Sequence, residues 1–150
     1  MSYEETLKGM GLIIEPIELD NGKFALATRV GDLIFTSGQI SSWDGKDIKG
    51  KVGADVSVEE AYEAARMCAL NNLRAIRSLV GSLDDIEQFV KVLGMVNVAP
   101  DFDNTPAVVN GCSDLLREVF GPAGQHSRSA VGMTIPFNWA VEVEMVVKVR

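Results

Sequence analysis

The sequence has few of the residues from which metal centres and hydrolytic triads are built. Its 150 residues include 1 histidine and 2 cysteines, and Cys68 and Cys112 lie in separate predicted helices rather than in a Cys-x-x-Cys pair. A zinc site from this chain would need an unusual carboxylate-rich ligand set. His126 is the one residue that could act as the base of a Ser-His-Asp triad. We therefore expect neither a metal site nor a triad.

Long apolar runs and an excess of basic residues are also absent. The longest uncharged stretch, 129–141, is too short to cross a bilayer. The N-terminus is acidic and lacks the basic and apolar regions of a signal peptide, so we expect a cytoplasmic protein with no membrane contact. With 14 basic and 21 acidic residues, the net charge of -7 also disfavours nucleic-acid binding.

The remaining composition fits one globular domain spanning 1–150. Apolar residues make up 47% of the chain and charged residues 23%, close to the averages for soluble globular proteins. A chain of this length buries roughly two-thirds of the surface that its unfolded form exposes, which is enough for a self-sufficient core. We find no internal repeat and no linker that would separate a second domain.

Two long helices are predicted from their caps and their apolar periodicity. Ser57 and Glu60 have the spacing of a capping box, and apolar residues then recur every three or four positions until Gly81. A second helix begins at Thr105, because the proline that follows suits the first helical position. Its apolar stripe stops before Gly121, which ends the helix.

Strands are predicted before, between and after these helices. After an irregular N-terminal segment, runs rich in β-branched and apolar residues occur at 24–30, 33–37, 89–99, 127–135 and 140–149. We interpret the first two runs as one hairpin and the last two as another. The order β-β-α-β-α-β-β favours an α+β fold, in which a mixed sheet carries both helices on one face.

The last predicted hairpin contains a group of charged residues that could carry chemistry. Arg128 begins an otherwise uncharged strand, while Glu142 and Glu144 share one face of the strand expected to pair with it. The planar fork of an arginine fits a carboxylate. Two interpretations stay open: a structural ion pair, or a site in which Arg128 holds a ligand carboxylate and a glutamate handles protons.

Short motifs along the chain occur in the order of one known family. They are Phe35–Ile40, Asn72–Ile76, Asn110, Arg128–Ser129 and Val141–Glu144. With these motifs in register, the chain resembles the Rid family of reactive-intermediate deaminases, also called the YjgF/UK114 or L-PSP endoribonuclease family. The resemblance runs from about residue 20 to the C-terminus. Residues 1–22 are an N-terminal extension, as in the longer-chain branch of the family.

The resemblance implies a chorismate-mutase-like fold and a homotrimer whose sheets form a central barrel, with ligand clefts between neighbouring subunits. The activity it implies is hydrolysis of 2-imino or enamine acids to 2-oxo acids and ammonia. The substrate is then a small carboxylate, and neither a metal nor an organic cofactor takes part. Such an imine is electrophilic once its nitrogen is protonated, so orientation and modest acid-base help suffice.

The same resemblance assigns roles to individual residues. Arg128 matches the carboxylate-binding arginine, and Glu142 matches the glutamate that positions water or transfers protons. Asn110 matches an asparagine of the cleft, and Ser37 with Gly38 matches a turn that lines it.

Two substrate-binding positions depart from the family's pattern. Phe24 stands where the deaminating branch commonly has a tyrosine, so its hydroxyl is missing. Ala130 stands where a small thiol residue is often found, two positions after Arg128, and Ser129 lies between them. Three functions therefore remain open: an imine deaminase, a non-catalytic trimer that binds small 2-oxo acids, and, disfavoured by the acidic charge, an endoribonuclease.

Overall fold

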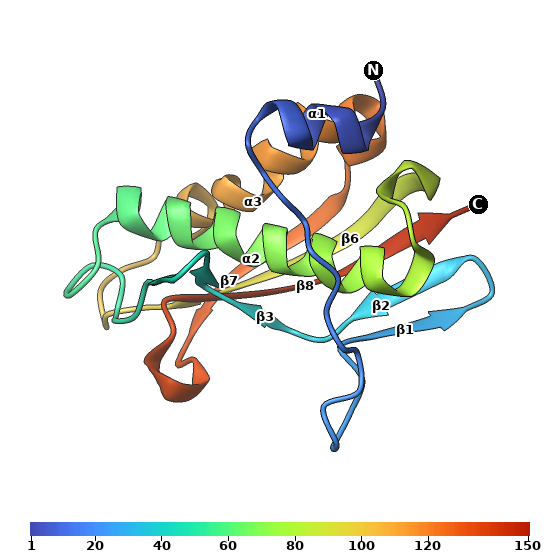
Figure 1. Ribbon diagram of the computed structural model, residues 1–150. Helices are drawn as coiled ribbons and strands as arrows, with labels where there is room; N and C mark the ends of the chain where they lie inside the picture. The colour runs from blue at the N-terminus through green and yellow to red at the C-terminus, as the bar shows by residue number, and fades with distance from the viewer.

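The computed structural model describes residues 1–150 as a mixed sheet with its helices on one side (Figure 1). The α-helices are α1 (Tyr3–Gly9), α2 (Val58–Val80) and α3 (Thr105–Phe120). The main sheet contains β1 (Ala27–Val30), β2 (Leu33–Thr36), β3 (Gln39–Ile40), β6 (Ile86–Asn97), β7 (Ser127–Met133) and β8 (Val141–Val149). A small separate hairpin is formed by β4 (Ser42–Trp43) and β5 (Lys46–Asp47). The predicted α+β fold is confirmed.

Both long helices begin and end where their caps predict. The Ser57 hydroxyl accepts a hydrogen bond from the Glu60 backbone N–H, and the Glu60 side chain accepts one from the Ser57 N–H in return. Gly81 ends α2 with a φ of 86°, a conformation that favours glycine. In α3, proline occupies the first turn and Gly121 follows the last helical residue.

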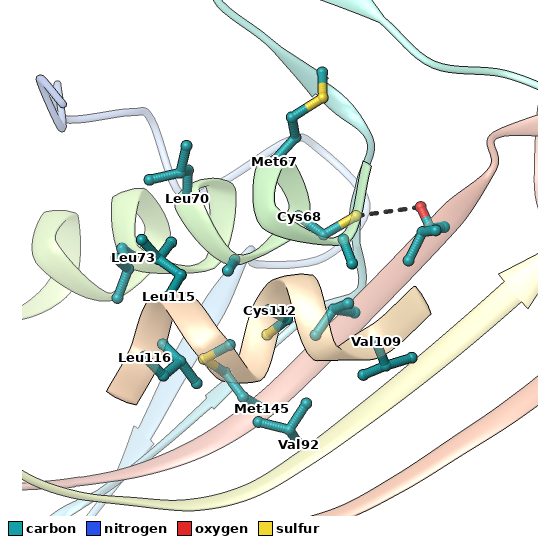
Figure 2. Packing of buried hydrophobic residues seen from close by; sticks show 14 of the residues in the cluster. Met67, Cys68, Leu70, Leu73, Val92, Val109, Cys112, Leu115, Leu116 and Met145 are labelled. Atoms are coloured by element: carbon teal, nitrogen blue, oxygen red, sulfur yellow. Dashed lines mark hydrogen bonds between the residues drawn. The ribbon is translucent and has the colours of Figure 1, made fainter. Parts of the chain in front are cut away.

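The core lies between the sheet and the two long helices. Figure 2 shows side chains of α2 and α3 packed against each other and against β6 and β8. Cys68 and Cys112 are fully buried there, and the Cys68 thiol donates to the Val141 carbonyl oxygen at 3.3 Å. Burial raises the pKa of both thiols, that of Cys112 to about 12. The two cysteines are therefore protonated core residues rather than nucleophiles.

The predicted closing hairpin is wrong. The strand order is β1-β2-β8-β6-β7, so β6 lies between the two strands that were expected to pair. β7 runs parallel to one edge of β6, and β8 runs antiparallel along the other. β6, α3 and β7 form a β-α-β crossover unit, the connection that parallel strands require, and β7 lies at the edge of the sheet. The segment 134–140 then carries the chain past the end of β6.

Smaller differences concern the ends of elements. β6 begins at Ile86 instead of residue 89, and the polar segment 38–54 contains the short strands β3, β4 and β5. The N-terminal extension forms α1 and then crosses α2, where the Ile17 N–H donates to the Ser78 hydroxyl. Glu4 of α1 also pairs with Arg77 of α2 at 2.9 Å. The extension therefore packs on the outer surface of the helix layer.

The other face of the sheet carries no α-helix, and a short 3-10 turn (Pro136–Asn138) lies at its end, between β7 and β8 (Figure 1). The strand registers place apolar side chains along it, including Phe35, Val131 and Met133, which are 41%, 40% and 39% exposed. A helix-free sheet face usually carries polar residues, so an apolar one is a candidate interaction surface. None of the helices combines the length and apolar character needed to span a membrane.

Candidate functional site

Arg128 and Glu142 lie on opposite faces of the sheet within one chain. Val92 of β6 is paired with Arg128 on one side and with Met145 on the other, and Val92 and Met145 are buried under the helices. Glu142 precedes Met145 by three residues, so its side chain points to the helix-free face. The prediction that Arg128 and Glu142 lie on adjacent, paired strands is also wrong, because β6 lies between β7 and β8, the strands that carry them.

Helix α3 holds Arg128 by one nitrogen of its guanidinium. Nη1 donates to Asn110 Oδ1 at 2.8 Å and to Ser113 Oγ at 3.2 Å, two acceptors that lie one turn apart on α3. Nε and Nη2 donate to no acceptor of the chain, and Arg128 takes part in none of the ion pairs. The structural ion-pair interpretation is thus excluded within the chain. A planar N–H edge remains free for a carboxylate.

A second pair of side chains continues the network away from Arg128. His126 Nε2 lies 2.9 Å from Ser113 Oγ, and His126 Nδ1 lies 2.7 Å from the Gly124 carbonyl oxygen. Burial lowers the pKa of His126 most, and the positive charges of Arg128 and Arg117 lower it further, against the opposing effect of the Gly124 hydrogen bond. The imidazole is therefore neutral near pH 7.

Glu142 lies against the backbone of the turn before β3. A Cβ atom added to Gly38 would lie 2.7 Å from Glu142 Cδ, so a larger residue here would displace the carboxylate from its present position. Burial raises the pKa of Glu142, and the nearby charge of Glu144 raises it further. Glu142 forms no ion pair in the chain. A half-buried carboxylate with a raised pKa suits general acid-base work.

Ser37 and Phe24 border the same turn. The Ser37 hydroxyl donates to the Ala25 carbonyl oxygen at 2.7 Å, and the Ser37 N–H donates to the Leu26 carbonyl oxygen at 2.9 Å. These bonds fix the turn against the segment that enters β1. Phe24 is 56% exposed, so its aromatic ring is accessible beside this turn.

Ser129 and Ala130 follow Arg128 along β7 with opposite orientations. Ala130 shares the helix-side face with Arg128, and Ser129 lies on the helix-free face with Glu142, as strand alternation requires. The Thr105 hydroxyl donates to the Ala130 carbonyl oxygen at 2.9 Å. The predicted residues therefore form two groups. Arg128, Asn110 and Ala130 make one group. Glu142, Gly38 and Ser37 make the other, with Phe24 beside Ser37 and Ser129 farther along the same face of the sheet.

The two main cavities of the chain lie elsewhere. One of about 260 Å³ lies between the N-terminal extension, Trp43 and Arg74, and one of about 390 Å³ lies beside α1. None of the predicted site residues lines either cavity. No three His, Cys, Asp or Glu side chains lie close enough together to hold a metal ion. The residues of both groups are partly or fully exposed on the surface of the chain.

Sequence reasoning missed Ser113 and gave His126 no assigned role. The signal for Ser113 is its position three residues after Asn110, which places both on one face of α3. His126 precedes Arg128 by two residues, so both point to the same side of the chain. The contact between them depends on how α3 packs against β7, which no local pattern reveals.

Comparisons with known proteins agree with this fold. A family model described as "YjgF/chorismate_mutase-like, putative endoribonuclease" matches residues 4–147, an earlier start than the predicted residue 20. Protein TCP17 of Trypanosoma cruzi is 39% identical over 123 residues, which are 80% of this chain and 77% of that protein. A protein of unknown function from Agrobacterium tumefaciens is 36% identical with a TM-score of 0.89, over 99% of this chain and 92% of its own.

Other solved structures separate into closer and more distant ones. One from Shewanella oneidensis, named as an endoribonuclease, is 32% identical with a TM-score of 0.92, over 99% of this chain and 100% of its own. TdcF of E. coli with bound serine is 25% identical with a TM-score of 0.57, over 91% and 94%. The Agrobacterium and Shewanella structures match 99% of this chain, so both include counterparts of its N-terminal extension.

Proposed function

The chain belongs to the YjgF/chorismate-mutase-like family, and from that premise we propose that it hydrolyses 2-imino acids, or their enamine tautomers, to 2-oxo acids and ammonia. One observation carries the proposal: Arg128 is anchored through Nη1 alone and keeps its Nε and Nη2 hydrogens for a ligand. An arginine held in this way is prepared for a planar carboxylate. TdcF of E. coli, a relative, has been solved with serine, which also carries an α-carboxylate.

In the proposed reaction, Arg128 binds the substrate carboxylate and so orients the neighbouring C=N bond. Once the imine nitrogen is protonated, the oxygen of a water molecule adds to the imine carbon while Glu142 takes up one proton of that water. The resulting carbinolamine carries a hydroxyl and an amino group on one carbon. Glu142 returns the proton to the amino nitrogen, and the C–N bond then breaks with its electron pair leaving on ammonia. The C=O bond of the 2-oxo acid forms as the hydroxyl proton passes to the Glu142 carboxylate, which releases it to ammonia or to water.

A homotrimer would bring the two groups of residues together. Arg128 and Glu142 face opposite sides of one sheet, so no single chain can apply both to one substrate. The apolar helix-free face, with Phe35, Val131 and Met133 exposed, supports association through that face. We therefore place the cleft between subunits, with Arg128 from one chain and Glu142 from the next.

The two departures from the family's pattern bear on the substrate. Phe24 supplies an exposed apolar ring where a tyrosine would supply a hydroxyl. Ala130 adds no polar atom beside Arg128. Both changes make the cleft less polar without touching the carboxylate-binding arginine. We therefore expect 2-imino acids with apolar side chains to be preferred.

A coupled assay tests this function. An amino-acid oxidase generates 2-imino acids in the presence of semicarbazide, which traps whatever imine the protein does not hydrolyse. We expect the wild type to accelerate imine loss and Arg128→Ala to lower kcat/KM about a hundredfold, as two charge-assisted hydrogen bonds of about 1.5 kcal/mol each imply. Arg66→Ala on α2 is the matched control, because Arg66 makes no ion pair or side-chain hydrogen bond.

The alternatives predict different results. A 2-oxo acid that binds without any acceleration of imine loss would favour the non-catalytic trimer. Cleavage of RNA by the wild type, abolished with Arg128→Ala, would favour the endoribonuclease function. Equal rates for the wild type and Arg128→Ala across a panel of imines would contradict the deaminase proposal.

A further inference from the structure

The hydrogen bonds behind Arg128 have one possible direction. The Gly124 carbonyl oxygen can only accept, so His126 Nδ1 carries the proton in the 2.7 Å contact between them. In the neutral imidazole Nε2 is then an acceptor, and the Ser113 hydroxyl donates its hydrogen to it across 2.9 Å. The lone pairs of Ser113 Oγ are left to accept from Arg128 Nη1. The chain of donors therefore runs from Arg128 through Ser113 and His126 to Gly124.

We propose that Ser113 and His126 are positioning residues, which orient the Arg128 guanidinium so that its Nε/Nη2 edge faces the substrate carboxylate. This inference rests on the proposed function and adds two residues to it. The two hydrogens of Nη1 are divided between Asn110 and Ser113, so the guanidinium cannot turn without losing one acceptor. With Asn110 as its only acceptor, the Arg128 guanidinium could rotate about a single hydrogen bond.

The order of donors matters because Ser113 could otherwise point its hydrogen at Arg128. A hydroxyl that donated toward the guanidinium would repel it. His126 prevents this, because its unprotonated Nε2 takes the hydroxyl hydrogen. The cations that face His126 are Arg117 on α3 and Arg128 on β7, and both favour the neutral imidazole that this order requires. His126 thus acts on the substrate only through Ser113 and Arg128.

The role of Ser113 is testable by substitution and ligand affinity. In the full-length protein, we expect Ser113→Ala to weaken binding of pyruvate or 2-oxobutanoate, measured by calorimetry, about tenfold, the value of one hydrogen bond to a charged group. Ser113→Thr keeps the hydroxyl and should restore most of the affinity. Ser127→Ala is the matched control, because Ser127 lies between His126 and Arg128 yet donates only to the Val90 carbonyl oxygen.

The single histidine gives a readout that is independent of activity. Because His126 is the only histidine, its imidazole nitrogens give one unambiguous set of ¹⁵N signals. We expect the Nδ1-protonated tautomer near pH 7. Ser113→Ala should raise the pKa of His126, since the hydrogen bond from Ser113 favours the neutral ring.

The outcomes separate this inference from the proposed function. Wild-type affinity in Ser113→Ala, or a His126 protonated on Nε2, would overturn the positioning role of Ser113 and His126. Loss of binding in Arg128→Ala would still support the carboxylate site in that case. Wild-type affinity in Arg128→Ala would overturn both. A loss in Ser127→Ala as large as that in Ser113→Ala would also overturn the chain, because general disturbance of β7 would then explain both variants.

Discussion

Glu142 is the residue whose ionisation the fold changes in the way that the proposed chemistry needs. Its pKa lies above the ordinary 4.5 because the carboxyl is half-buried, with a further contribution from the charge of Glu144. The folded state therefore binds the proton more tightly than the unfolded state does. Ionised Glu142 lowers stability above its folded pKa, and this cost disappears as the pH falls below 4.5.

Glu142→Gln should therefore separate catalysis from stability. We expect kcat to fall about a hundredfold, as for loss of a general acid-base group, with little change in affinity for a 2-oxo acid. The melting temperature near pH 7 should stay the same or rise, because a half-buried charge is removed. In the wild type, kcat should decrease with falling pH, with a midpoint above 4.5, as Glu142 becomes protonated. Glu142→Gln should lack this acid-side decrease. Measuring kcat of both proteins over a pH series tests the difference.

Glu144→Gln is the matched control, since Glu144 is exposed on the same face two residues away. It should retain most of the activity and shift the acid limb slightly downward, because one neighbouring negative charge is gone. Equal losses of affinity and kcat in Glu142→Gln, together with a lower melting temperature, would instead mark Glu142 as a structural residue.

Among the elements, α3 links the core to the site. It carries Asn110 and Ser113, which hold Arg128, on one face and packs its other face against α2 (Figure 2). The two helices approach closely at Gly111, where an added Cβ would lie 2.8 Å from the carbonyl carbon of Tyr62. The Tyr62 hydroxyl also donates to Asp114 at 2.6 Å. The position of Arg128 thus depends on a helix-helix contact remote from the ligand.

Gly111→Ala should disturb both the core and the site. We expect a loss of about 2 kcal/mol or more in the free energy of unfolding, because backbone atoms of α2 cannot easily move aside for the methyl group. Gly9→Ala in α1 has no neighbour within 4 Å and should leave stability unchanged or raise it by up to about 1 kcal/mol. Urea unfolding of the two variants measures the difference. Equal stabilities would refute the close approach.

At the scale of the whole molecule, the proposed site requires more than one chain. Light scattering should give about three times the chain mass of 16.2 kDa. Val131→Asp introduces a charge on the helix-free face, and we expect it to dissociate the trimer and abolish turnover without changing the far-ultraviolet circular dichroism. Ile13→Asp, at a 69% exposed position on the N-terminal extension, is the matched control and should remain trimeric.

A monomeric wild type that still hydrolyses imines would contradict the cleft between subunits. Arg128 and Glu142 would then have to act on different ligands, since one sheet lies between them. Mixing Arg128→Ala with Glu142→Gln adds a direct test. In a mixed trimer, some clefts combine the intact Arg128 of a Glu142→Gln chain with the intact Glu142 of an Arg128→Ala chain. The mixture should therefore recover part of the activity that each variant lacks.

Local patterns determined most of the elements and singled out Arg128 and Glu142, but not Ser113. The capping box at Ser57, the proline after Thr105 and the glycines at 81 and 121 act over a few residues, so the bounds of α2 and α3 could be derived from the sequence. The alternation in 141–149 likewise predicted that Glu142 and Glu144 share one face of β8, the face opposite its buried residues. The identity of Arg128 and Glu142 as the pair of interest came from the same short-range patterns and from the family resemblance.

Only the tertiary structure decided which strands pair and where these side chains meet. Two adjacent strands joined by a short polar segment look like a hairpin, yet the long buried β6 needs hydrogen-bond partners along both edges and takes β7 on one and β8 on the other. That choice puts Arg128 and Glu142 on opposite faces and brings Ser113 to His126. Strand pairing is non-local, because it depends on which edges remain free after the whole core has packed.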